Sequence, residues 1–107
     1  GVRIPHIVPT TTRMSWFVYV IRLEPDVDRQ HVMAELGARG IPSRAYFTPI
    51  HLQPFYVQRF GYRRGHFPVT ERLGETCLAL PFSSPMSRDQ VDRVCDALVC
   101  ALRRKMA

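Results

Sequence analysis

The residues best suited to chemistry gather in one block in the middle of the chain, from Gly40 to Tyr56. The block reads GIPSRAYFTPIHLQPFY and contains three prolines, one histidine and four aromatic residues. Prolines fix backbone φ angles and aromatic side chains favour burial, whereas ordinary loops favour Gly, Ser, Asn and Asp. We interpret the block as a shaped binding loop. His51 lies between Pro49 and Pro54, where its ring is either aimed at a ligand or satisfied within a loop network.

A second candidate is the stretch Arg59 to Phe67, RFGYRRGHF, which interleaves arginines with aromatic residues. This pattern suits stacking and phosphate contacts on single-stranded nucleic acid, and it also suits the phosphate of a sugar nucleotide. The other arginines are scattered among acidic neighbours, so the chain lacks a long basic stripe. Nucleic acid is therefore not the favoured partner.

Other kinds of active site find no support in the sequence. The histidines are too dispersed for a metal site: His6, His31, His51 and His66. The cysteines lack CxxC spacing and are expected to be small buried hydrophobes: Cys77, Cys95 and Cys100. Glu71 and Glu75 share one face of a predicted helix, which is typical of a solvated face. We predict no metal site and no catalytic residue in this chain.

Composition limits the kinds of protein that fit. The 107 residues suffice for one domain, and the net charge of +6 comes from 15 basic residues, of which only Lys105 is a lysine. Arginine favours an anionic partner, although a GC-rich genome would also enrich it. The chain contains no apolar run of about 18 residues and its cysteines form no disulfide framework, so we expect a cytoplasmic protein without a membrane partner. Gly1 is not a methionine, which indicates a fragment or processed product.

The first half of the chain predicts a linker, a strand and a helix. Residues 1–15, with Pro5 and Pro9, form an extended linker segment. Residues 16–23, WFVYVIRL, are nearly all apolar, as in a central strand that is covered on both faces. Asp28 is placed to cap a helix that ends at Gly40.

The second half predicts alternating short strands and helices. The expected elements are a strand at 41–47, helical turns at 55–60, a basic hairpin or loop at 61–65, a helix at 68–76 and a strand at 77–80. Ser87 and Gln90 form a capping box for a final helix. Its predicted buried face comprises Val91, Val94, Cys95, Leu98 and Leu102. Together these elements predict an α+β domain in which helices pack on a small sheet in two layers.

Four stretches resemble the C-terminal part of the DegT/DnrJ/StrS family of PLP-dependent sugar aminotransferases: SWFVYVIRL, DRQHVMAELGARGIPSRAYFTPIHLQPFY, FGYRRGHFPVTERLGETCLALPF and MSRDQVDRV. The resemblance covers nearly the whole chain. Four signatures follow the family order: the Trp16 strand, the Gly40–Ile41 turn into a P-x-H-x-Q-P loop, Phe67–Pro68 with Glu71, and Leu80–Pro81.

The resemblance implies that residues 16–107 are the small domain of a fold-type I aminotransferase, with a mostly antiparallel sheet. Such a domain packs on its own large PLP-binding domain, which is absent from this chain, and works in a homodimer with active sites near the subunit interface. The implied substrate is a nucleotide-linked keto sugar, and glutamate is the typical amino donor. PLP chemistry requires a Schiff-base lysine, and Lys105 is close to the chain end, without a PLP pocket around it. We therefore expect the chain alone to bind no PLP and to be inactive.

The resemblance also implies substrate-binding residues. Tyr46 and His51 match the loop that borders the active site in the family, and Arg44 lies beside Tyr46. Arg63 and Arg64 are expected to contact the substrate phosphates or the partner subunit. Ala45 occupies a position where the family often has a histidine, which argues against a histidine role there.

Two other hypotheses remain open from the sequence. One is a stand-alone binding or regulatory module without catalysis, which would require a sheet face polar enough to be solvated. The other is a nucleic-acid-binding domain, which would lose affinity steeply with salt. The apolar strand at residues 16–23 favours a domain whose surface is covered by another one.

Overall fold

The computed structural model describes residues 1–103, and Lys105 therefore lies outside the described residues. Within them a four-stranded antiparallel sheet has the order β1-β2-β4-β3. The strands are β1 (Val2–Arg3), β2 (Tyr19–Leu23), β3 (Arg44–Ala45) and β4 (Cys77–Leu80). The helices are α1 (Arg29–Ala38), the 3-10 turn η1 (Ile50–Leu52), α2 (Pro54–Phe60), α3 (Pro68–Thr76) and α4 (Arg88–Arg103). The predicted α+β fold with an antiparallel sheet is confirmed.

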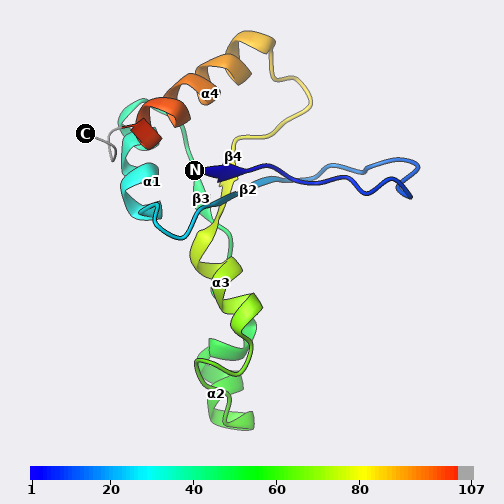
Figure 1. Ribbon diagram of the computed structural model, residues 1–107, viewed down its shortest axis with the longest axis vertical. Helices are drawn as coiled ribbons and strands as arrows, with labels where there is room; N and C mark the ends of the chain where they lie inside the picture. The colour runs from blue at the N-terminus through cyan, green and yellow to red at the C-terminus, as the bar shows by residue number, and fades with distance from the viewer. Residues whose placement is uncertain (104–107) are drawn as a thin grey trace.

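The core lies between one face of the sheet and the helices α1 and α4 (Figure 1). β2 is an interior strand, as predicted, and Ile21 is opposite Leu78 of β4. The residues that form the core are Ile21, Leu23, Val32, Leu36, Ile41, Leu78, Ala97 and Ala101. Val20 and Arg22 alternate with these residues and are only half buried, so β2 is not fully covered on both faces.

The strands are shorter than the sequence predicts because strand length depends on partners. β2 begins at Tyr19 instead of Trp16, where its pairing with Leu80 at the end of β4 begins. β3 comprises only Arg44 and Ala45 of the predicted 41–47, and Phe47 then has a φ of 57°, which ends the extended backbone. Residues 2 and 3 form the edge strand β1, which the sequence did not predict.

Helix α1 begins and ends at the residues that its capping signals predict. The Asp28 side chain accepts hydrogen bonds from the N–H groups of Gln30 and His31. At the other end of α1, Gly40 has a φ of 72°, and the N–H groups of Gly40 and Ile41 donate to carbonyls of the last turn. The predicted cap and terminator of α1 are confirmed.

Helix α4 begins with the predicted capping box, in which Ser87 and Gln90 exchange hydrogen bonds. Val94, Leu98 and Leu102 of the predicted face pack against the core, but the face is shifted at the other positions. Ala97 and Ala101 are buried, whereas Val91 is 44% exposed and Cys95 is also exposed. Since α4 packs on α1, small alanines allow close approach there, and the larger Val91 and Cys95 lie off the contact.

Two parts of the chain project from this core (Figure 1). Residues 4–18 form an extended excursion that connects β1 to β2, and α2 and α3 form an arm that points away from the sheet. No helix within residues 1–103 has the length and apolarity needed to span a membrane. The predicted site residues lie at the end of β3, on η1 and in the connection between α2 and α3.

Candidate functional site

The first predicted site residues lie where β3 leaves the sheet. Arg44 is exposed on β3, and Tyr46 is half buried directly after it. The rings of Tyr46 and Phe47 are in contact, with centroids 4.7 Å apart. Phe47 holds a positive φ although its side chain is 73% exposed, and a strained backbone with an exposed ring is typical of functional loops.

His51 follows on η1 and is buried, with 6% of its surface exposed. Its Nε2 lies 2.8 Å from Oε1 of Glu71 and donates to that carboxylate. Its ring packs edge-on against Phe67, with centroids 4.8 Å apart. The Nε2 atom of His51 is therefore satisfied within a loop network, and contact of the ring with a ligand stays a prediction.

Glu71 is the centre of that network. It comes from the first turn of α3, is 8% exposed, and its two oxygens also accept from the N–H of Gly65 at 2.8 and 3.0 Å. The hydrogen bond from His51, helped by the backbone N–H groups of Gly65 and Phe67, lowers the pKa of Glu71 against the opposing effect of burial. The expectation that Glu71 is solvated is wrong, because the loop before α3 folds over it.

Arg63 and Arg64 lie in the loop of residues 61–67, which connects α2 to α3. Arg63 Nε lies 3.5 Å from Nε2 of His66. Arg64 forms an ion pair with Glu75 at 2.8 Å, and both side chains are exposed, by 71% and 62%. For Glu75 the solvated face is therefore confirmed.

A small cavity of about 200 Å³ lies between the loop at residues 45–52 and α3. Among the residues that line it are Phe47, Pro49, Arg64, Glu71 and Glu75. Of the five predicted substrate-binding residues only Arg64 reaches this cavity, and Arg44, Tyr46, His51 and Arg63 do not line it. The structure thus brings Arg64 close to the loop at residues 45–52. This proximity could not be predicted from the sequence.

Arg29 is a further residue of this region that the sequence missed. From the first turn of α1 its Nη1 donates to the carbonyl oxygens of Gly74, at 2.6 Å, and Cys77, at 3.1 Å. Because both acceptors are backbone groups more than forty residues away, no local pattern signals this contact. Arg29 fixes the end of α3 against α1 and also lines the small cavity.

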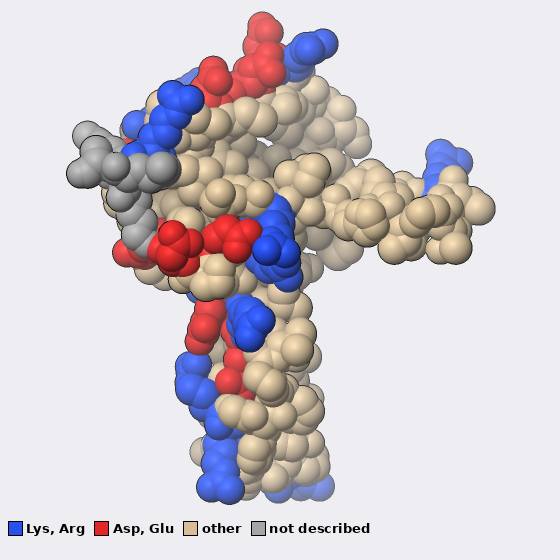
Figure 2. Space-filling model, viewed as in Figure 1, with Lys and Arg blue, Asp and Glu red and all other residues tan. Residues whose placement is uncertain are grey.

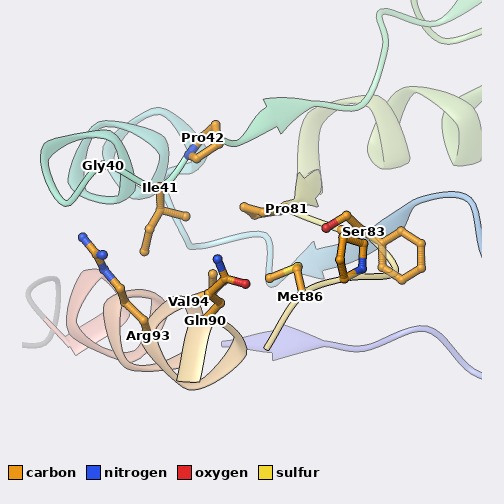
Figure 3. A pocket seen from close by; sticks show the side chains of 11 residues that line it. Gly40, Ile41, Pro42, Pro81, Ser83, Met86, Gln90, Arg93 and Val94 are labelled. Atoms are coloured by element: carbon orange, nitrogen blue, oxygen red, sulfur yellow. The ribbon is translucent and has the colours of Figure 1, made fainter. Parts of the chain in front are cut away.

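A separate groove lies between the Gly40–Pro42 turn and the start of α4 (Figure 3). It is lined largely by apolar side chains, among them Ile41, Pro42, Pro81, Met86 and Val94. Its cation, Arg93, donates from Nη2 to the carbonyl oxygen of Arg39. No predicted site residue lines this groove, and its lining contains no pair of groups suited to acid–base catalysis.

The arm combines arginines with a chain of ring contacts. The rings touch in the order Phe55, Tyr56, Phe60, Tyr62 and Phe67, with centroids 5.4 to 5.9 Å apart. Figure 2 shows basic groups at the lower end of the arm, beside an uncharged surface. Such a surface suits an anionic ligand or a partner protein.

Residues 1–103 do not fit a PLP site. They contain no lysine to form the Schiff base. The buried acid Glu71, which could otherwise serve a pyridine nitrogen, is already engaged by His51 and Gly65. The chemistry of the described residues therefore does not fit this cofactor.

The sequence of this chain is similar to those of known aminotransferases and their relatives. The family model described as the DegT/DnrJ/EryC1/StrS aminotransferase family matches residues 1–99. The chain is 33% identical over 95 residues to the erythromycin biosynthesis sensory transduction protein EryC1 of Saccharopolyspora erythraea, covering 88% of this chain and 25% of that protein. It is 31% identical over 96 residues to GDP-perosamine synthase of Caulobacter vibrioides, with the same coverage.

The fold agrees with this match. The crystal structure of the aminotransferase TlmJ from Streptoalloteichus hindustanus superposes with a TM-score of 0.83 at 27% identity, covering 100% of this chain and 28% of that one. The chain spans about a quarter of the length of the curated relatives that it matches.

Proposed function

We propose a function from one premise: the chain belongs to the DegT/DnrJ/EryC1/StrS aminotransferase family. In this proposal it is the C-terminal part of a PLP-dependent aminotransferase that converts a nucleotide-linked keto sugar into an amino sugar. Glutamate is the proposed amino donor. The family match over residues 1–99 is the observation that carries this proposal.

Residues 16–107 are proposed to be the small domain, and residues 1–15 its entry segment, of which Val2–Arg3 pair with β2 as the edge strand β1. Aminotransferases of this family depend on PLP, and we place the cofactor and its lysine in the remaining part of the protein, because the described residues do not fit them. The exposed aromatic residues of the arm support contact with another domain or subunit, including Phe55, Phe60 and Phe67. The assembly proposed is a cytoplasmic homodimer.

The contribution of this chain to the reaction is binding and orientation of the substrate. Arg63 and Arg64 carry permanent positive charge on an exposed loop and suit the phosphates of a nucleotide sugar. A relative named GDP-perosamine synthase supports a substrate of this class. Tyr46, Arg44 and His51 remain predicted members of the same site.

The activity is tested with the full-length protein and with residues 1–107 alone. The full-length protein should show PLP absorbance and transfer an amino group from glutamate to a nucleotide-linked keto sugar, whereas the isolated chain should do neither. A full-length protein that binds no PLP would contradict the proposal and leave a binding or regulatory module.

The substrate contact is tested by replacing Arg63 and Arg64 with Ala together in the full-length enzyme. The KM for the nucleotide sugar should rise about tenfold or more while kcat changes little, because a charge-assisted contact to the ground state is removed. Replacing Arg88 and Arg103, two exposed arginines of α4, is the matched control and should leave KM unchanged. Equal KM values in both double variants would rule out the phosphate contact.

A further inference from the structure

The buried pair His51–Glu71 joins two segments that both carry predicted substrate residues. His51 lies on η1, five residues after Tyr46, and the N–H of Gly65, directly after Arg64, donates to the same carboxylate. We propose that His51 and Glu71 form a latch that holds the loop of residues 61–67 against η1 and thereby positions Arg63 and Arg64. The positioning role rests on the proposed function, whereas the latch itself does not.

A carboxylate suits both donors of the latch, because a charged acceptor forms the stronger hydrogen bonds. Glu71 Oε1 accepts from both His51 Nε2 and Gly65 N, and Oε2 accepts from Gly65 N as well. Since a carboxylate only accepts hydrogen bonds, it satisfies both donors at once. A glutamine at this position would keep Oε1 as an acceptor for both donors, but as a neutral one, and its N–H₂ group would face the N–H of Gly65, which is also a donor.

The latch also requires the backbone conformation of Gly65. Its φ of 95° orients its N–H toward Glu71, and an added Cβ would meet open space there. Backbone conformation, and not crowding, therefore accounts for glycine at this position. The second anchor of the loop, the Arg64–Glu75 ion pair, is mostly exposed and contributes little by comparison.

Glu71→Gln is compared with Glu75→Gln in the full-length protein, using hydrogen exchange of residues 61–67. Both variants remove one negative charge from α3, but only the first lies in the latch. Exchange of the loop should accelerate about tenfold or more in Glu71→Gln, as expected for a lost hydrogen bond to a charged group, and should stay near that of the wild type in Glu75→Gln. The KM for the nucleotide sugar should rise in the same variant.

Three outcomes would overturn the proposal. Equal loop exchange in the two variants would eliminate the latch. Faster exchange in Glu71→Gln with an unchanged KM would eliminate the positioning role. If the full-length protein has no transaminase activity, KM cannot be measured, but hydrogen exchange of the loop still tests the latch. Should Glu71→Gln fail to fold, NMR of the wild type decides: the His51 Nε2–H should exchange slowly with water, and a rapidly exchanging proton there would contradict the latch.

Discussion

At the scale of single residues, the buried carboxylate of Glu71 predicts that the loop of residues 61–67 is sensitive to acid. The hydrogen bond from His51 is the main cause that lowers the pKa of Glu71 below the ordinary value of a glutamate. Because the unfolded chain takes up this proton at a higher pH than the folded one, the stability that Glu71 contributes is complete above the ordinary carboxyl range. It is lost as the pH falls through that range to the lowered pKa.

We expect the loop of residues 61–67 to stay protected from exchange above the ordinary carboxyl range and to lose protection as the pH falls through that range toward the lowered pKa of Glu71. The measurement is hydrogen exchange of this loop as a function of pH, corrected for the intrinsic rate. In Glu71→Gln this pH dependence should be absent. If both proteins gave the same profile, Glu71 would not be the group that titrates.

Glycine conformation gives a second prediction for single residues. Gly65→Ala should destabilise the loop by about 1 kcal/mol, because the new side chain meets no obstacle but the positive φ disfavours it. Gly37→Ala is the matched control, since Gly37 lies in α1 with nothing within 4 Å of an added Cβ. It should stabilise α1 by about 0.5–1 kcal/mol.

Hydrogen exchange of the full-length protein measures both changes. Exchange should be faster at residues 61–67 in Gly65→Ala and slower within α1 in Gly37→Ala. Unchanged exchange in Gly65→Ala would mean that the loop accepts a left-handed alanine without cost.

At the scale of elements, α3 and the loop at residues 47–49 approach closely because Gly74 has no side chain. An added Cβ would lie 2.8 and 2.9 Å from Cδ and Cγ of Pro49, and a proline ring cannot rotate away. Gly74→Ala should therefore cost about 1–3 kcal/mol, although alanine is the better helix former.

Exchange of the η1 amides and the KM for the nucleotide sugar are the measurements for Gly74→Ala. Both should rise, since η1 carries His51 and the loop before it lines the small cavity. A more stable variant would show that helix propensity outweighs the contact.

The elements that could be predicted from the sequence are those with signals inside their own segment. The helix at residues 68–76 and the strand at 77–80 have the predicted bounds, and the caps at Asp28 and Ser87 are present. β1 and the ends of β2 and β3 depend on pairing with distant residues, so their limits could not be read locally. The His51–Glu71 pair was not predicted for the same reason: neither segment contains a local pattern that indicates a partner twenty residues away.

The whole molecule is more open than a chain of this length that folds alone. Its radius of gyration is 16.0 Å, compared with about 13 Å for a compact domain of this size. Its accessible surface is 8286 Å², compared with about 6,100 Å² expected for its mass. The excess comes from the arm and from residues 4–18, which expose apolar side chains such as Ile4, Phe17 and Phe55.

We expect residues 1–107 alone to bind a hydrophobic dye and to self-associate as concentration rises, because these apolar surfaces are uncovered. The full-length protein should bind much less dye per chain. Dye fluorescence and sedimentation of both proteins test this prediction. An isolated chain that stays monomeric and binds no dye would indicate that the apolar surface of the arm is stable in water without a partner domain. This result would favour the stand-alone module.

The shortness of the two edge strands limits how such association can proceed. β1 and β3 have two residues each, so neither edge of the sheet offers a long continuous strand as a template. Fibril growth by addition of strands needs a long flat edge as a template. Clusters of the isolated chain should therefore be amorphous and dissolve on dilution, without the cross-β signature of amyloid.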